Sequence, residues 1–337
     1  CIRDSFLRGL LTHLHETLPD GRGGTSAEVT VIGNTGDDIW LYGVKICPDL
    51  DSVMYTLGGG IDDERGWGRA DETFTVKEEL LAYGAAPDWF GLGDRDVATH
   101  LVRTQLLTAG VPLSQVTARL CERWQPGVHL IPMTDARVET HVVVDDPDAG
   151  TAADGTPLRH AIHFQEWWIR HRAALPAHAF VLRGVDEAAP APGVLEALQW
   201  ADVVLLPPSN PVVSIGTILA VPGVRAGLRA TQAPVVGVSP IIGGSPVRGM
   251  ADACLAAIGV ETTAAAVGAH YGARRTRVPE GGDGGGLLDG WLVDTSDADA
   301  LGSLEALGLT ARAVPLWMRY ETTAAALAGA ALALAQE

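Results

Sequence analysis

The chain has 337 residues, and 47% of them are hydrophobic, which allows one large α/β domain or a domain with a sizeable insertion. Its formal net charge of −17 argues against a nucleic acid as a partner, and its apolar stretches are too short to span a membrane. Its four widely spaced cysteines match neither a zinc nor a disulfide pattern and, with no signal-peptide pattern at the start, predict a cytoplasmic protein.

The first half of the chain alternates between short apolar runs and polar loops. Helical spacing of the hydrophobic residues predicts a helix over 6–17, and a short apolar run predicts a buried strand over 28–32. Helical patterns and tryptophans are frequent over 61–127, which predicts a mostly helical insertion. Strands are expected again at 128–132 and 138–144.

The second half alternates more regularly. Short apolar strands are predicted at 203–206, 235–238, 290–294 and 311–316. Helices are predicted at 192–200, 223–230, 250–258 and 321–335. Helices of about ten residues between short apolar strands predict a parallel sheet with right-handed crossovers.

Four aspartates follow the strand predicted at 28–32, namely Asp37, Asp38, Asp49 and Asp51. In open α/β sheets, ligands bind at the C-terminal ends of the strands. Carboxylates gathered there repel one another unless a cation or a proton donor lies between them, and a hard divalent metal holding a diphosphate would meet this need. Alternatively, these residues serve only as helix caps and turn residues, since aspartate suits both roles.

Two later turns have the composition of anion-binding sites. The segments 208–216 and 239–244 each follow a predicted strand and are rich in small residues. Unpaired backbone N–H groups at a helix N-terminus favour anions, and Ser209 and Asn210 can also donate hydrogen bonds. The alternative is that both are ordinary strand-to-helix connections.

A dense polar segment, Gly93–His100, precedes a predicted helix. Arg95 lies between two aspartates there, so it is either a ligand-binding residue or part of a self-contained ion pair. His100 and His163 are more simply interpreted as structural histidines than as metal ligands.

Several motifs occur in the same order in one known family. They are Asn34–Asp38, Pro48–Asp51, Gly93–Asp96, Ala98–His100, His163–Gln165, Pro208–Pro211, Ser214–Gly216 and Ser239–Gly243. On these motifs the chain resembles the 2-phospho-L-lactate transferase family of coenzyme F420 biosynthesis, from about residue 6 to the C-terminus. The segments 55–60, 65–68 and 123–127 resemble the actinobacterial phosphoenolpyruvyl transferase branch.

This resemblance implies a Rossmann-like α/β core with a mostly parallel sheet flanked by helices, formed by 1–60 and 128–337, and a largely helical insertion at 61–127. It implies Mg²⁺ and a homodimer. It also implies that the ribityl hydroxyl of the deazaflavin FO attacks a guanosine diphosphate-linked enolpyruvate or lactate. GMP then leaves, and the product is dehydro coenzyme F420-0, or F420-0 if lactate is used.

The resemblance also suggests roles for individual residues. For magnesium we expect Asp37, Asp38, Asp49 and Asp51, and for catalysis Asp51, Asp38 and Asp49. For FO we expect Asp51, Arg95 and His100, and for the nucleotide Asn34, Ser209, Asn210, Ser239 and Gly243. If Asp51 accepts the hydroxyl proton, Asp51→Asn should slow turnover with little loss of stability.

One part of the family pattern has no counterpart in the sequence. The family pattern places a strand and a Gly-Gly-x-Gly loop before the helix that contains Phe6, whereas the sequence begins at Cys1 without them. Such a loop would hold a phosphate through its backbone N–H groups. This departure favours an alternative function, a non-catalytic protein that binds FO or a guanine nucleotide. A general sugar-nucleotide transferase also stays open.

Overall fold

The computed structural model describes residues 2–62, 65, 68–145, 150–151, 153–274 and 285–337. The chain divides into two compact units, each described by itself below. The first unit comprises Cys1–Thr30, Gly127–His129 and Pro192–Glu337. The second comprises Val31–Pro126 and Leu130–Ala191. Within the described residues, no helix is both long and apolar enough to cross a membrane.

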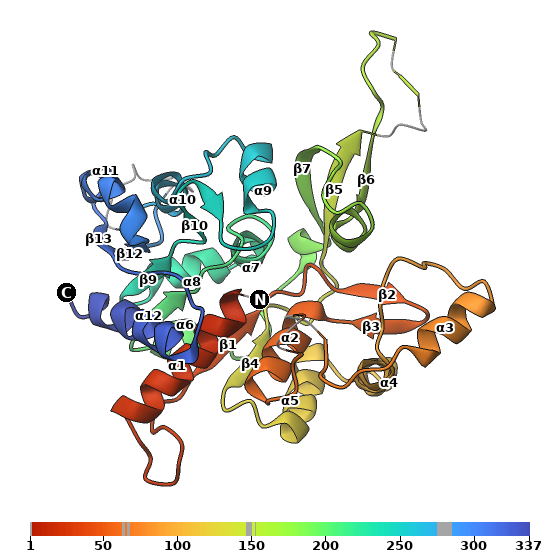
Figure 1. The fold of residues 1–337 in the computed structure, drawn as a ribbon, viewed down its shortest axis with the longest axis horizontal. Coiled ribbons are helices and arrows are strands. Elements are labelled where there is room, and N and C mark those ends of the chain that lie inside the picture. Colours follow the sequence, from red (N-terminus) through yellow and green to blue (C-terminus); the bar gives the residue numbers. More distant parts are fainter. Residues whose placement is uncertain (1, 63–64, 66–67, 146–149, 152, 275–284) are drawn as a thin grey trace. The chain divides into compact units, whose positions relative to one another are not determined.

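A four-stranded parallel sheet organises the first unit (Figure 1). Its strands are β8 (Val204–Leu206), β9 (Val235–Val238), β12 (Gly290–Val293) and β13 (Thr310–Ala313), in the order β13-β12-β9-β8. All three neighbouring pairs are parallel, and Gly290 lies opposite both Val236 and Thr310. This confirms the parallel sheet predicted from the alternation after residue 190.

Helices fill most of the remaining first unit. They are α1 (Ile2–Thr17), α6 (Val194–Trp200), α7 (Ile215–Ala220), α8 (Val224–Ala230), α9 (Ala251–Ala257), α10 (Ala264–Tyr271), η3 (Thr295–Ala300), α11 (Leu301–Ala306) and α12 (Glu321–Leu334). The short strands β10 (Ile241–Ile242) and β11 (Ser245–Pro246) pair antiparallel. The four helices predicted in the second half are confirmed as α6, α8, α9 and α12.

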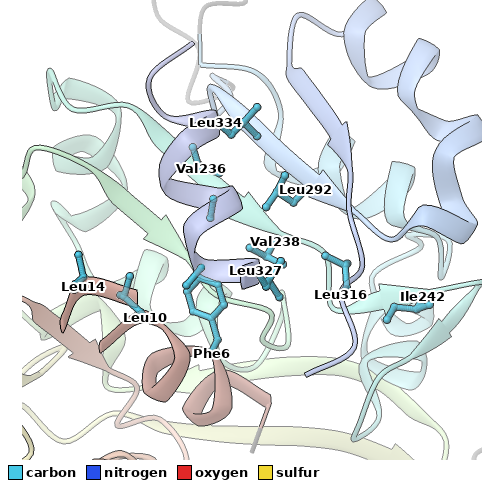
Figure 2. Close-up of a cluster of buried hydrophobic side chains, with 12 residues drawn as sticks. Phe6, Leu10, Leu14, Val236, Val238, Ile242, Leu292, Leu316, Leu327 and Leu334 are labelled. Atoms are coloured by element: carbon cyan, nitrogen blue, oxygen red, sulfur yellow. The ribbon is translucent and has the colours of Figure 1, made fainter. Parts of the chain in front are cut away.

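Neighbouring residues of β12 place helices on both faces of the sheet. Side chains alternate between the two faces along a strand, so Trp291 and Leu292 point in opposite directions. Leu292 packs with Phe6 of α1 and Leu327 of α12 in one apolar cluster (Figure 2). Trp291, fully buried, donates a hydrogen bond from Nε1 to the carbonyl oxygen of Ala264 in α10 over 3.1 Å. The sheet is therefore covered by α1 and α12 on one side and by α10 on the other.

Helices α1 and α12 approach closely because Gly9 has no side chain. A Cβ atom at this position would lie 2.3 Å from the carbonyl carbon of Ala324. We expect Gly9→Ala to lower the free energy of unfolding by about 1–3 kcal/mol, since the two backbones would have to separate. Urea unfolding measures the loss. Gly302→Ala in α11 is the control, since its Cβ would meet nothing within 4 Å, and an equal loss in both variants would contradict the packing argument.

The second unit combines short sheets with four longer helices. Its helices are α2 (Pro48–Leu57), α3 (Thr75–Ala82), α4 (Asp94–Thr108), α5 (Leu113–Trp124) and the short η1 (Glu166–Arg170) and η2 (Val185–Glu187). Its strands are β1 (Thr30–Gly33), β2 (Ile39–Leu41), β3 (Val44–Ile46), β4 (His129–Pro132), β5 (Glu139–Asp145), β6 (Arg159–His163) and β7 (Ala177–Arg183), with β1 and β4 crossing the unit boundary. Helices α3, α4 and α5 lie within 61–127, but the predicted domain division itself stays a prediction.

Two sheets of this unit differ from the parallel pattern. Strands β6, β5 and β7 form an antiparallel sheet in that order, which the sequence argument did not predict. Strands β2 and β3 form a hairpin whose turn residues Tyr42 and Gly43 have φ angles of 50° and 79°. Such mirror-image turns match the twist of a hairpin. The hairpin brings Lys45 back toward the loop that precedes β2.

Candidate active site

The acidic loop and the start of α2 meet in the second unit. Cys47 precedes the helix and Pro48 is its first residue, which suits the missing N–H of proline. Asp49 and Asp51 stand in the first turn, where the helix dipole favours negative charge. Asn34 Nδ2 donates a hydrogen bond to Asp49 Oδ2 over 2.9 Å, which joins the loop after β1 to α2. No side chain caps α2, so Asp49 and Asp51 are first-turn residues and not the helix caps of the alternative interpretation.

Asp38 is paired with a lysine inside the protein. Its side chain is 1% exposed, and Lys45 Nζ lies 3.2 Å from Oδ2. Burial raises the pKa of Asp38, and the positive charge of Lys45 opposes this shift. Lys45 was not among the predicted site residues, although a lysine within the apolar run 39–46 of a chain with only two lysines was a usable signal.

Asp51 belongs to a buried polar network with four other side chains. Arg103 Nη2 donates a short hydrogen bond to Asp51 Oδ1, and Arg103 Nη1 lies 3.1 Å from Nδ1 of His100. His100 Nε2 lies 3.2 Å from Asp96 Oδ2, and the Tyr55 hydroxyl donates to Asp96 Oδ1 over 2.6 Å. Because α4 places Asp96, His100 and Arg103 at positions i, i+4 and i+7, one helix face presents all three.

The charges in this network are stabilised by their neighbours. Burial alone would lower the pKa of Arg103, but the nearby Asp51 carboxylate raises it overall, so the guanidinium stays charged. Burial alone would raise the pKa of Asp96, but hydrogen bonding with His100 and Tyr55 lowers it overall. The network therefore favours the ionised forms of Asp96 and Arg103 within the protein.

The acidic cluster has the chemistry that a hard cation needs. Asp51 Oδ2 is buried and accepts no hydrogen bond from the described part of the chain. Carboxylate oxygens are the ligands that Mg²⁺ prefers, so these residues fit the ion. Asp51, Asp96 and His100 also present potential ligand atoms within 4.8 Å of one another. The imidazole nitrogen and the nearby charge of Arg103 make that group a poorer place for Mg²⁺, and assignment of the ion to the four predicted aspartates stays a prediction.

Arg95 and His100 lie on the same helix in contrasting environments. His100 is fully buried, whereas Arg95 is exposed and its guanidinium has no ion pair or hydrogen bond with any described residue. The aspartates beside Arg95 have other partners, since Asp94 accepts from the backbone of α3 and Asp96 contacts Tyr55 and His100. The alternative of a self-contained ion pair is therefore wrong, and Arg95 presents a cation to solvent.

His163 has the structural role that the sequence favoured. Its Nε2 lies 3.2 Å from the carbonyl oxygen of Asp38, and its Nδ1 accepts a hydrogen bond from the backbone N–H of Gln165. Burial lowers the pKa of His163 to about 4, so the ring is neutral near pH 7 and donates to the Asp38 carbonyl. The histidine fixes the loop that carries Asp38.

The predicted nucleotide-binding residues other than Asn34 lie in the first unit. Asn210 Oδ1 accepts hydrogen bonds from the backbone N–H groups of Val212 and Val213, over 2.9 and 3.2 Å. Ser239 is fully buried, and its hydroxyl donates to the carbonyl oxygen of Ile241. Ser209 is also buried. These side chains shape their turns, which leaves contact with a nucleotide as a prediction.

Gly243 shows that its turn attracts an anion. Its backbone N–H donates to both carboxylate oxygens of Asp297, over 3.1 and 3.0 Å. Gly243 and Gly244 have φ angles of 56° and 76°, a region that glycine adopts without strain. A phosphate at this N–H group would have to displace the Asp297 carboxylate.

Comparisons with known proteins cover nearly the whole chain. The model of a family described as 2-phospho-L-lactate transferase CofD matches residues 4–308. The phosphoenolpyruvate transferase of Streptomyces coelicolor is 61% identical over 332 residues, which is 98% of this chain and 94% of that protein. The protein of the same name from Thermobifida fusca is 60% identical with the same coverage.

A solved structure also aligns with the chain. This protein of the UPF0052 family from Bacillus halodurans has a TM-score of 0.57 and 17% identity, over 98% of this chain and 96% of that one. At this level of identity the alignment supports the fold alone. It agrees with a mixed α/β chain that contains a parallel sheet flanked by helices.

Proposed function

This chain belongs to the 2-phospho-L-lactate transferase family, and we propose that it transfers a phosphoenolpyruvyl group to the deazaflavin FO in coenzyme F420 biosynthesis. The observation that carries this proposal is the 61% identity, over 98% of the chain, to a protein named phosphoenolpyruvate transferase. The same relatives favour enolpyruvate over lactate as the three-carbon acid. The donor in this proposal is guanosine diphosphate-linked enolpyruvate.

The proposed reaction exchanges one phosphorus–oxygen bond for another. The ribityl hydroxyl oxygen of FO bonds to the phosphorus that bears the three-carbon acid, and the bond from that phosphorus to the oxygen of GMP breaks. The hydroxyl proton passes to Asp51 Oδ2, directly or through one water, and GMP leaves with the electron pair of the broken bond. Phosphoryl transfer depends mainly on positioning and on charge neutralisation, which a buried and oriented carboxylate serves.

The remaining roles are proposals of the same kind. Asp37, Asp38, Asp49 and Asp51 are the candidates for holding Mg²⁺, which would neutralise charge on the diphosphate. Where Asp51 Oδ2 accepts the hydroxyl proton, the other three aspartates would hold the ion. Asn34, Ser209, Asn210, Ser239 and Gly243 are proposed for the nucleotide, and Asp51, Arg95 and His100 for FO. Since His100 is fully buried, we propose that it acts on FO through its neighbours in the Asp51 network. A homodimer and a cytoplasmic location also stay predictions.

Release of GMP tests the proposed function. The protein would be incubated with FO, guanosine diphosphate-linked enolpyruvate and Mg²⁺, followed by liquid chromatography and mass analysis of the deazaflavin product. Stoichiometric GMP and dehydro coenzyme F420-0 are expected, with loss of both after chelation of the metal. The lactate-linked donor run in parallel identifies the preferred acid. Tight binding of FO without GMP release would instead indicate a non-catalytic binding protein.

Arg95 offers a separate test of the FO contact. Arg95→Ala is expected to weaken FO binding about tenfold or more, because a hydrogen bond to a charged group contributes about 1.5–3 kcal/mol. Fluorescence titration of FO measures the affinity. Arg170→Ala, which removes an exposed arginine paired with Glu166, is the control and should bind FO as the wild type does. Equal affinity in all three proteins would remove Arg95 from the FO site.

A further inference from the structure

Arg103 is a buried cation whose contacts converge on Asp51. Its side chain is 1% exposed, and its Nη2 donates to Asp51 Oδ1. Its Nη1 lies 3.3 Å from the carbonyl oxygen of Lys45 and 3.1 Å from His100 Nδ1. A planar guanidinium with several fixed partners has one orientation, which a flexible lysine would not reproduce.

His100 contacts this guanidinium, and Asp96 contacts His100. Because Nδ1 of His100 faces a guanidinium N–H, it is the accepting nitrogen, and the ring proton is on Nε2. Nε2 lies 3.2 Å from Asp96 Oδ2, and the other oxygen of Asp96 accepts the hydrogen bond of the Tyr55 hydroxyl. The order Tyr55, Asp96, His100, Arg103 and Asp51 is therefore a continuous chain of polar contacts.

The two oxygens of Asp51 have different environments. Oδ1 is bound by Arg103, whereas Oδ2 accepts no hydrogen bond from the described residues and lies 3.7 Å from His100 Nδ1. A carboxylate fixed through one oxygen presents the other in a defined direction. Proton acceptance requires such a direction, because a base must reach its proton within hydrogen-bond distance.

We propose that Arg103 is the positioning residue of Asp51, supported by His100 and Asp96, and that it directs Oδ2 of Asp51 toward the reacting hydroxyl. This inference rests on the proposed function, in which Asp51 accepts the proton from FO. Arg103 acts through Asp51, so its loss should reduce kcat and leave substrate affinity nearly unchanged. A purely structural ion pair would instead change stability alone.

Two substitutions of Arg103 separate charge from geometry. Arg103→Lys keeps the charge and loses the planar fork, and Arg103→Met loses both. We expect kcat to fall about tenfold in the lysine variant and about 100-fold in the methionine variant, as for a reacting group displaced by about 1 Å. The KM values for FO and the donor should stay within about threefold of the wild type, because binding is not the step affected. Arg274→Met is the matched control, since it removes an arginine paired with Asp289 in the first unit, and its kcat should equal that of the wild type.

A stability measurement tests the contact independently of activity. Urea unfolding of the wild type, Arg103→Met, Asp51→Asn and the double variant gives a double-mutant cycle of unfolding free energies. We expect the double variant to lose less than the sum of the single losses, because each single change leaves a buried charge without its partner. Wild-type kcat in both Arg103 variants, or an additive cycle, would overturn the positioning role. If the wild-type protein releases no GMP, the proposed function fails, and the cycle alone then decides whether Arg103 holds Asp51.

Discussion

Replacing Asp51 by asparagine is expected to slow turnover at least about 100-fold, the effect typical of a positioned general base. The amide nitrogen or oxygen at this position cannot accept the hydroxyl proton at neutral pH, whereas Oδ2 of the carboxylate can. Steady-state release of GMP at saturating FO and donor measures kcat. A rate equal to that of the wild type would remove Asp51 from the proton transfer.

The structure changes the expected effect of this substitution on stability. The sequence alone predicts little loss, but Asp51 is paired with the buried Arg103, so the neutral asparagine leaves that charge uncompensated. Removing one partner of a buried ion pair costs up to about 3–5 kcal/mol of unfolding free energy. Turnover must therefore be measured well below the melting temperature of the variant.

A half-buried aspartate with an arginine partner provides the control for this stability loss. Asp289 is paired with Arg274 in the first unit, and neither residue has a role in the proposed reaction. Asp289→Asn should also unfold more easily than the wild type but should keep its kcat. A large fall in kcat in this control would mean that general destabilisation, and not loss of the base, explains the effect of Asp51→Asn.

The fold was predictable where elements follow one another closely in the sequence. The strands β8, β9 and β12 are short apolar runs separated by helices, so local periodicity and the right-handed crossover rule were sufficient. Strand β6 was missed because its sequence, Arg159–His163, has neither clear alternation nor an apolar run. Its strand character comes from pairing with β5, which is a property of the folded chain.

The acidic residues of the candidate site could be identified from the sequence, but the basic residues that pair with them could not. Asp51 was identified because it follows a strand and matches a family motif. Clustered carboxylates were expected to need a cation or a proton donor, with a divalent metal as the proposed cation. The folded protein places Lys45 beside Asp38 and Arg103 beside Asp51, and the metal stays a prediction. The β2–β3 hairpin brings Lys45 near Asp38, and the packing of α4 beside α2 brings Arg103 near Asp51. Neither distance follows from spacing along the chain.

Lys45→Met is expected to lower the free energy of unfolding by about 3–5 kcal/mol at pH 7, because it leaves the buried Asp38 carboxylate without its cation. Urea unfolding at pH 7 measures this loss. Lys77→Met is the control, since Lys77 is the only other lysine and lies on α3, a helix that has no buried residue. A surface substitution of this kind should change stability by less than about 0.5 kcal/mol.

The loss in Lys45→Met should shrink as the pH falls. Burial already raises the pKa of Asp38 in the folded protein, and removal of Lys45 takes away a charge that lowers it. When the pKa of a carboxyl is higher in the folded than in the unfolded protein, the free energy of unfolding falls as the pH rises through the folded pKa. Protonation of the carboxyl restores this stability. Below that pKa the neutral Asp38 no longer needs the lysine, so the two proteins should approach equal stability.

Asp38→Asn added to Lys45→Met should likewise restore part of the stability at pH 7. A loss that stays constant with pH and survives the second substitution would show that lost packing of the lysine side chain, and not the unpaired carboxylate, destabilises the variant.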